Sequence, residues 1–392
     1  MGAGASLSGF GTPVYVGSMA LTPRPSLPGK PDPAAAARLT EVAAAAAALR
    51  AGLAIIVTDG KGGRSVALSV ETATDKEISA LTARAGSSGQ LMLTHARAQT
   101  LKIRLYTPDV VAVPLEAGWS ADHIRAIADP TADLTEPMKG PFDAGRESLA
   151  AGAAAAVKLA KLAGLLPAAL VWPASASKPG MSEIMAATIM GYEDDSVAAL
   201  ALVTRAQVPL EGAEKAELAA FRPGGGGPEH YAIIINAPAP HDPVLTRLHS
   251  ECFTGDLLGS LKCDCGAQLR GAIEAIAKSG GGILLYLAQE GRGIGLINKL
   301  RAYRLQDQGF DTIEANERLG FDADERLYGV AARMLRLLGY ESVRLLTNNP
   351  DKMAALQAAG VAVIERVPHA FPDNEHNRAY LKTKAEKAGH LL

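Results

Sequence analysis

The three cysteines of this chain lie within fourteen residues in a C-x10-C-x-C pattern, as Cys252, Cys263 and Cys265. An odd number of clustered cysteines does not build a disulfide framework, and in a reducing compartment such thiols more often bind a metal. Three thiolates with an open fourth position are typical of a catalytic zinc site, whereas a fourth protein ligand closes a structural one. His249 is the nearest candidate for a fourth ligand. Three interpretations stay open: an open zinc site, a closed one with His249, and buried thiols without metal.

Length and composition bound the class of protein. A chain of 392 residues is longer than a single hydrophobic core usually supports, which predicts two domains. The formal net charge of −2 and the lack of a long basic run argue against a nucleic-acid partner. No apolar stretch reaches the roughly 18 residues of a membrane helix, and the first residues lack the pattern of a signal peptide. We therefore expect a cytoplasmic, globular protein with neither a nucleic-acid nor a membrane partner.

The first half of the chain predicts a mixed α/β domain. Residues 1–32 are rich in Gly, Pro and Ser and predict a poorly ordered lead-in. An Ala-rich helix is expected from Pro33 to Gly52, followed by strands and by a helix that Thr74 caps. The polar, Gly-rich segment 206–230 predicts a linker or loop. This composition predicts domains at 33–205 and 206–392.

The second half alternates strands and helices, which predicts a second α/β domain. Buried-strand patterns are separated by helical patterns that end at Gly. The expected strands lie at 231–238, 244–251, 283–291, 342–348 and 361–368, and the expected helices at 268–282, 297–309, 326–340 and 350–360. The fold class is therefore α/β (α+β), with two mixed domains.

Four polar clusters in the second half are candidates for ligand binding, each with a plainer structural interpretation. The Gly-rich segment 289–295 either approaches a ligand or is an ordinary turn between a strand and a helix. Lys299 and Arg304 either clamp phosphates or belong to a solvated helix face. The acidic segment 322–325 suits the positive end of the following helix. Residues 347–350 end a strand and begin a helix, where open α/β sheets bind anions. Thiolates together with anion sites indicate hydrolysis of a nucleotide ring.

The second half resembles GTP cyclohydrolase II in the segments RLHSECFTGDLLGSLKCDCGAQL, LLYLAQEGRGIGLINKLRAYRLQDQG, DTIEANERLGFDADER and RLLTNNPDKMAAL. The resemblance runs from about Val244 to Leu392. It implies hydrolysis of GTP to 2,5-diamino-6-(5-phospho-ribosylamino)pyrimidin-4(3H)-one, formate and diphosphate, the first step of riboflavin biosynthesis. It also implies one catalytic zinc ion, Mg2+ on the triphosphate and a homodimer.

The resemblance also implies roles for individual residues. The zinc would be held by Cys252, Cys263 and Cys265. Tyr303 would assist at the ring-opening centre, and Arg326, with Asp324 as proton acceptor, would act at the α-phosphorus. The GTP contacts would come from Arg247, His249, Ser250, Glu251, Gln268, Glu290, Gly291, Arg292, Thr312, Thr347 and Lys352.

Two features of this assignment stay open. An arginine has a pKa above about 12, so Arg326 either needs Asp324 as a base or stabilises charge while water attacks. Ala288 stands where the family usually has arginine, which removes one cation near the Gly-rich loop.

The first half resembles 3,4-dihydroxy-2-butanone 4-phosphate synthase in GLAIIVTDGKGGRSVALSVETATDKEI and AAVKLAKLAGLLPAALV. The acidic run after the first strand of that family is replaced here by DGKGGR, and its G-H-T-E motif by residues 151–154, AGAA. Without these carboxylates and imidazole there is neither a hard-metal site nor a general base. We expect an inactive domain with a structural role. For the whole chain, the alternatives are a variant that stops at the ring-opened formamide or serves another pathway, and a zinc-stabilised binding module.

Overall fold

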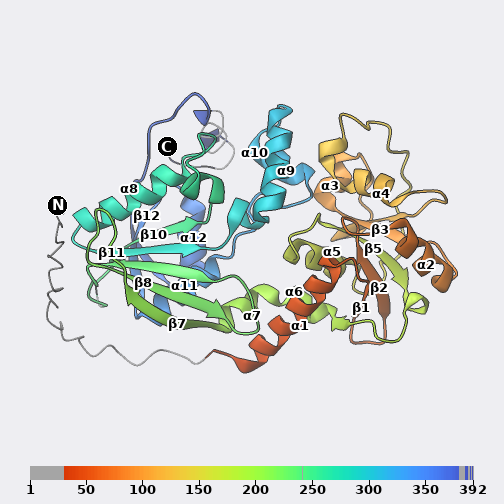
Figure 1. The fold of residues 1–392 in the computed structure, drawn as a ribbon, viewed down its shortest axis with the longest axis horizontal. Coiled ribbons are helices and arrows are strands. Elements are labelled where there is room, and N and C mark those ends of the chain that lie inside the picture. Colours follow the sequence, from red (N-terminus) through yellow and green to blue (C-terminus); the bar gives the residue numbers. More distant parts are fainter. Residues whose placement is uncertain (1–30, 241, 379–384, 387–388, 390, 392) are drawn as a thin grey trace, which may run out of the picture.

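The computed structural model describes residues 31–240, 242–378, 385–386, 389 and 391. Most of the lead-in predicted for residues 1–32 lies outside these residues. Two β-sheets flanked by helices form a mixed α/β fold, as the sequence predicted, and the two sheets lie at opposite ends of the molecule (Figure 1).

The first sheet has six strands in the order β4-β3-β5-β2-β1-β6, antiparallel except for the parallel pair β1–β6. Successive residues of its central strands point into two different cores: Leu68, Leu91 and Leu170 into one, and Ala67, Met92 and Val171 into the other. The sheet is therefore covered on both faces. Its strands are β1 (Ile55–Thr58), β2 (Arg64–Ser69), β3 (Gln90–Thr94), β4 (Val110–Pro114), β5 (Ala168–Pro173) and β6 (Glu183–Met185).

The first two helices of the N-terminal half begin where the sequence predicts, and the first also ends there. In the first, Pro33 occupies the first turn, the side chain of Asp32 accepts a hydrogen bond from the Ala34 amide, and Gly52 follows the end with φ +73°. Thr74 caps the next helix through the Glu77 amide at 3.3 Å. The helices are α1 (Pro33–Arg50), α2 (Asp75–Ala85), α3 (His95–Thr100), α4 (Ala121–Ala128), α5 (Ala153–Leu162), α6 (Ala186–Met190) and α7 (Tyr192–Ala198).

The second sheet has seven strands in the order β13-β12-β10-β11-β9-β8-β7, with parallel pairing among β13, β12, β10 and β11. The helix α8 (Cys265–Lys278) packs on one face through Ala272 and Ile276, and α11 (Tyr328–Leu338) and α12 (Pro350–Ala358) pack on the other. The strands are β7 (Leu200–Gln207), β8 (Ala216–Pro223), β9 (His230–Ile235), β10 (Val244–Ser250), β11 (Gly282–Leu287), β12 (Ser342–Leu346) and β13 (Ala362–Val367).

The linker predicted for residues 206–230 is wrong in part, because β8 lies inside it and pairs with both β7 and β9. The strand buries Ala216, Ala219 and Phe221. Alanine is uncommon in strands, and Gly-rich turns flank this one, so its alternation was hidden by its composition. The seven-stranded sheet begins with β7 at Leu200.

The helices α9 (Gly295–Asp307) and α10 (Thr312–Arg318) lie between the two sheets (Figure 1). Although they follow β11 in the chain, they pack against the first sheet. Leu305, Leu319 and Phe321 share one hydrophobic core with Leu93 of β3 and Ile127 of α4. The N-terminal half is thus a direct neighbour of the segment that carries the candidate site. Among the described residues, no helix combines the length and the apolar character needed to span a bilayer.

Candidate active site

The three cysteines converge at the carboxyl end of β10. Cys252 follows that strand, Cys265 begins α8, and Cys263 lies two residues before it. The three sulfur atoms lie within 4.8 Å of one another, and those of Cys252 and Cys263 are 3.8 Å apart. Gly255 leaves room for them, because a Cβ there would meet the Cys263 sulfur at 2.8 Å. This donor set fits the zinc ion implied by the sequence, and it is the only His/Cys/Asp/Glu cluster of this kind in the described part of the chain.

His249 lies beside the thiols and is held by a carboxylate. Its Nε2 atom is 3.0 Å from both oxygens of Asp256, which also accepts hydrogen bonds from the Cys252 amide and the Tyr286 hydroxyl. Burial lowers the pKa of His249, although Asp256 acts in the opposite direction. The geometry therefore supports the open three-thiol site rather than closure by His249.

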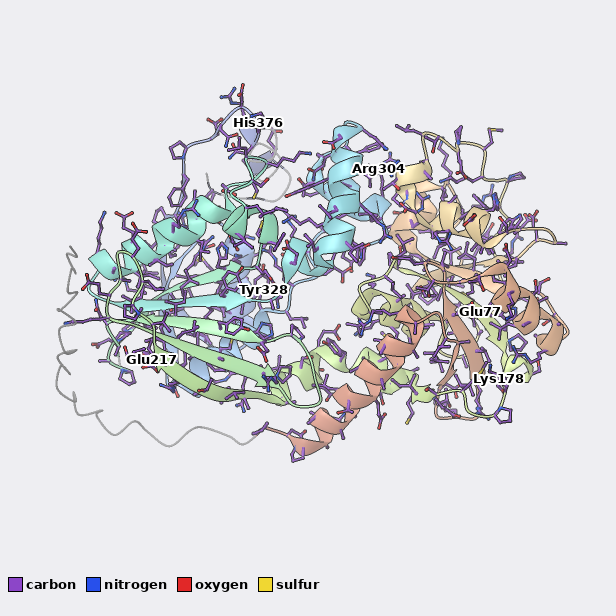
Figure 2. The ribbon with its side chains drawn as sticks, viewed as in Figure 1. Glu77, Lys178, Glu217, Arg304, Tyr328 and His376 are labelled. Carbon is purple, nitrogen blue, oxygen red and sulfur yellow. The ribbon has the colours of Figure 1, made fainter. Side chains whose placement is uncertain are left out.

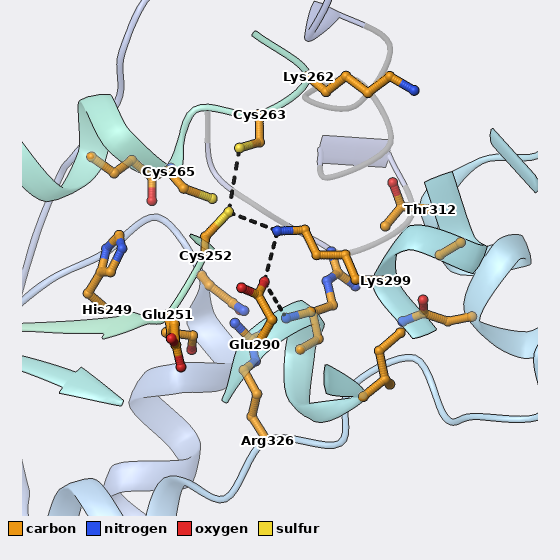
Figure 3. Close-up of a pocket in the computed structure, with 18 of the residues that line it drawn as sticks. His249, Glu251, Cys252, Lys262, Cys263, Cys265, Glu290, Lys299, Thr312 and Arg326 are labelled. Carbon is orange, nitrogen blue, oxygen red and sulfur yellow. Dashed lines mark hydrogen bonds and ion pairs between the residues drawn. The ribbon is translucent and has the colours of Figure 1, made fainter. Parts of the chain in front are cut away.

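Lys299 of α9 is buried against the thiols, so its assignment to a solvated helix face was wrong. Its ammonium lies 3.0 Å from the Cys252 sulfur and 2.8 Å from the Glu290 carboxylate (Figure 3). It also lies 2.9 Å from the Thr254 hydroxyl. Arg304, on the same helix, is exposed as expected (Figure 2). Lys299 thus places one positive charge where the thiolates and Glu290 concentrate negative charge.

Hydrogen bonding among the three thiols shifts the pKa values of Cys252 and Cys263 in opposite directions. Hydrogen bonds from Cys263 and Cys265, reinforced by Lys299, lower the pKa of the Cys252 thiol, while Cys252 raises the pKa of Cys263 to about 11. One thiolate forms readily beside Lys299 and the neighbouring thiols donate to it. Metal binding displaces the remaining protons, since zinc binds thiolates.

One pocket contains the thiols and nearly all the site residues that the sequence predicted. Its walls carry more cations than carboxylates, which suits a polyphosphate. The carboxylates are Glu251 and Glu290, and the cations are Arg247, Lys262, Arg292, Lys299, Arg326 and Lys352. The predicted residues that line it are Arg247, His249, Ser250, Glu251, Cys252, Cys263, Cys265, Gln268, Glu290, Gly291, Arg292, Tyr303, Thr312, Arg326, Thr347 and Lys352.

The pocket lies at the carboxyl ends of the parallel strands β10, β11 and β12, where open α/β sheets bind ligands. Arg247, 5% exposed, donates to the Leu346 carbonyl at 2.9 Å and to the Gln268 side chain. Its Nε and the Ser250 hydroxyl are buried and have no hydrogen-bond partner among the described residues. Burial lowers the pKa of Arg247 to about 10, which leaves it charged at neutral pH. The Nε atom of Arg247 and the hydroxyl of Ser250 can therefore bind a ligand in the pocket.

Asp324 is the one predicted site residue that does not line the pocket. It instead holds Arg326 through two parallel bonds, Nε to Oδ1 at 2.7 Å and Nη2 to Oδ2 at 2.6 Å. Burial alone would raise the pKa of Asp324, but Arg326 outweighs it and lowers that pKa. The helix-capping interpretation of this segment is wrong, since α11 begins after Leu327 without a side-chain cap.

The pocket also contains residues that sequence reasoning did not assign to the site. Lys299 was detectable, because it lies four residues before Tyr303 and thus on the same face of α9. The His369 ring nitrogen bonds to the Gln268 carbonyl at 2.9 Å, a contact between distant segments that no local pattern reveals. The lining residues that received no individual role in the site from the sequence are Lys262, Ile294, Lys299, Ala302, Gln306, Asn316, Asn348, Asn349 and His369.

In the N-terminal half, the turn after β1 and the start of α5 lie together. Ser65 donates to the Ala151 carbonyl at 2.5 Å, and a Cβ on Gly63 would meet both Asp59 and Ala151. Asp59 uses its carboxylate within the turn, accepting from the Lys61 and Gly63 amides. The two motifs that the sequence identified as altered are therefore neighbours.

Comparisons with known proteins agree with this geometry. A family model for GTP cyclohydrolase II matches residues 201–368. A GTP cyclohydrolase-2 from Azospirillum brasilense is 49% identical over 365 residues, covering 91% of this chain and 95% of that protein. A riboflavin biosynthesis protein RibBA from Bacillus cereus is 58% identical over 164 residues, 42% of this chain and 41% of that protein.

Among solved structures, RibBX from A. baumannii, a two-domain 3,4-dihydroxy-2-butanone 4-phosphate synthase, covers 84% of this chain and 99% of its own. Its sequence identity is 18% and its TM-score is 0.32. The alignment with the Azospirillum protein extends over nearly the full length of both chains. The chain belongs to the GTP cyclohydrolase II family.

Proposed function

We propose that this chain hydrolyses GTP to 2,5-diamino-6-(5-phospho-ribosylamino)pyrimidin-4(3H)-one, formate and diphosphate, as the first step of riboflavin biosynthesis. The observation that carries the proposal is one pocket that contains three thiols within 4.8 Å, a surplus of cations, and Arg326, which Asp324 holds from outside the pocket. Opening a purine ring needs an activated water, and releasing diphosphate needs charge stabilisation at phosphorus. Both requirements are met within this pocket.

Cys252, Cys263 and Cys265 would hold the zinc ion. Zinc with three protein ligands lowers the pKa of its water towards neutrality and so supplies the nucleophile for ring hydrolysis. Lys299 offsets the surplus negative charge of three thiolates and keeps Glu290 oriented through its 2.8 Å bond. Burial, and then Glu290, raise the pKa of the Glu251 carboxyl group.

Tyr303 lines the same pocket as the thiols, and its contacts with Thr254 and Lys299 help to orient it. Its hydroxyl is 3.5 Å from that of Thr254, and the Lys299 ammonium lies 5.5 Å from its ring centroid. Burial raises the pKa of Tyr303, so it is a neutral hydrogen-bond donor at physiological pH. We assign it to orienting the purine at the ring-opening centre.

The triphosphate would bind along the cationic wall with Mg2+ shared among its oxygens. Arg326 would act at the α-phosphorus. The fork to Asp324 fixes the guanidinium plane and stabilises its charged form, which favours stabilisation of the transition state over loss of a proton to become a nucleophile. Thr347, Lys352 and Arg247 would hold the nucleotide at the strand ends.

For the N-terminal half we propose an inactive 3,4-dihydroxy-2-butanone 4-phosphate synthase domain at about 33–205, ahead of the cyclohydrolase domain at about 206–392. The neighbouring loops at Asp59 and Ala151 offer one carboxylate and no imidazole. A hard-metal site needs several oxygen ligands. Conversion of ribulose 5-phosphate by the purified chain would refute this assignment. We further propose a cytoplasmic homodimer, which analytical ultracentrifugation tests.

The ring-opening assignment is tested by following formate release from GTP with Mg2+ and zinc. We expect formate from the wild-type chain, and none from Cys263→Ser, because that substitution leaves two thiolates. A Cys263→Ser protein that retains zinc and still releases formate would contradict the role given to the cluster.

A further inference from the structure

A lysine of the N-terminal half contacts the loop that carries the phosphorus-directed arginine. Lys161, on α5, places its ammonium 2.6 Å from the Glu325 carboxylate and 5.5 Å from the centroid of the Phe321 ring. Both members of this ion pair are about four-fifths buried. Glu325 lies directly between Asp324 and Arg326. The contact therefore reaches the Asp324–Arg326 pair from outside the pocket.

Glu325 is also the point where this loop meets the Gly-rich loop after β11. Its amide donates to the Arg292 carbonyl at 3.0 Å, and its side chain accepts from the Asp322 amide at 2.9 Å. Gly293 has φ +95°, and a Cβ there would lie 2.7 Å from the Glu325 carbonyl oxygen. The two loops touch without space between them, so a displacement of Glu325 would move Arg326 and Arg292 together.

The helix next to these loops is held by the N-terminal half as well. Asn298 of α9 is fully buried and donates to the Gly164 carbonyl, at the end of α5, at 3.3 Å. Arg301 pairs with Glu71 at 3.0 Å. The opposite side of the same helix presents Lys299 and Tyr303 to the pocket. Helix α5 and the segments next to it thus pack behind α9, on the side away from the pocket.

We infer that Lys161 is a positioning residue for the Asp324–Arg326 pair, so that the N-terminal half completes the phosphate side of the cyclohydrolase pocket. This inference rests on the proposed function for the role of Arg326. The support acts through charge: the ammonium fixes Glu325, Glu325 fixes the loop at Gly293, and the loop sets the guanidinium that faces the α-phosphate.

The chain offers a matched control on the same helix. Lys158 lies one turn before Lys161, is equally buried at 20% side-chain exposure, and pairs with Glu193 of α7 rather than with the pocket loops. Both lysines make a partly buried ion pair from α5. Only one of the two pairs leads to the pocket, so their comparison separates positioning from a general loss of stability.

The experiment uses the full chain with GTP, Mg2+ and zinc, and measures diphosphate release. We expect Lys161→Met to lower kcat about three- to tenfold with KM within twofold, because one partly buried charge pair is lost. Lys158→Met should keep the wild-type kcat. Lys161→Arg should retain most of the wild-type kcat. The double variant Lys161→Glu with Glu325→Lys should have a higher kcat than Lys161→Glu alone.

Hydrogen exchange of residues 322–327 provides a second readout that does not depend on turnover. Lys161→Met should speed exchange at the Glu325 amide, whereas Lys158→Met should not. Equal kcat and equal exchange for the two lysine variants would overturn the inference, as would a charge-reversed double variant no better than the single one. If the wild-type chain releases no diphosphate, the proposed function fails, and the exchange comparison still decides whether Lys161 positions the loop.

Discussion

Replacing Lys299 by methionine should destabilise the C-terminal half measurably, because the ammonium is the counter-charge of a buried carboxylate. The two side chains of the Lys299–Glu290 pair are 10% and 9% exposed. Removing one member of a buried pair costs about 3–5 kcal/mol. Glu290 keeps two backbone donors, the amides of Phe253 and Gly291. We therefore expect a cost near the lower end, about 3 kcal/mol, which lowers Tm by about 6–12 °C in a domain of this size.

The assay is thermal unfolding followed by circular dichroism at pH 7, with a metal chelator and a reductant present so that zinc binding does not contribute. Lys278→Met is the matched control, since Lys278 and Glu274 form an exposed pair on α8 with side chains 74% and 62% exposed. We expect that control to change stability by less than about 0.5 kcal/mol. Adding Glu290→Gln to Lys299→Met should recover part of the loss. Equal Tm for Lys299→Met and Lys278→Met, or no recovery in the double variant, would refute the reasoning.

Three further predictions concern the metal, the phosphate and the pH dependence. Gly255→Ala should lower zinc affinity about tenfold or more, measured by competition with a chromogenic chelator, because the new methyl group meets two sulfur atoms at 2.8 and 3.0 Å. Arg326→Lys should slow diphosphate release about 100-fold with zinc content unchanged, because lysine lacks the two-bond fork. Stability should fall as pH drops from about 6.5 to about 4, since burial lowers the pKa values of His230 and His369 to about 4 while the unfolded chain binds protons near pH 6.5. His230→Asn should make the free energy of unfolding, measured by urea titration, less dependent on pH. An unchanged slope of that free energy against pH would contradict this prediction.

The elements with strong local signals were predictable from the sequence. Pro33, the Thr74 cap and the Gly52 stop each act on a few neighbouring residues, and the structure confirms all three. The clustering of the cysteines was equally predictable, because only one residue separates Cys263 from Cys265 and Cys252 follows the preceding strand. Signals from residues close together in the sequence were therefore sufficient to predict these features.

The remaining features depend on contacts between distant segments. The cation-rich helix segment that contains Lys299 has the composition of a solvated face. The burial of Lys299 becomes favourable only because Glu290 and Cys252, from other segments, approach its ammonium. The packing of α9 and α10 on the first sheet likewise has no local signature. Asp324 was interpreted as part of a helix cap, but its carboxylate binds Arg326, which follows it by two residues, and does not cap α11.

The product stoichiometry with GTP tests the central claim most directly. Purified full chain is incubated with GTP, Mg2+ and zinc, and formate, diphosphate and the pyrimidine product are quantified by mass. We predict formate and diphosphate in equal amounts, together with the ribosylamino-pyrimidine monophosphate. Diphosphate with a ring-opened formamide, diphosphate with an intact purine, or no turnover by a zinc-loaded chain would contradict the account.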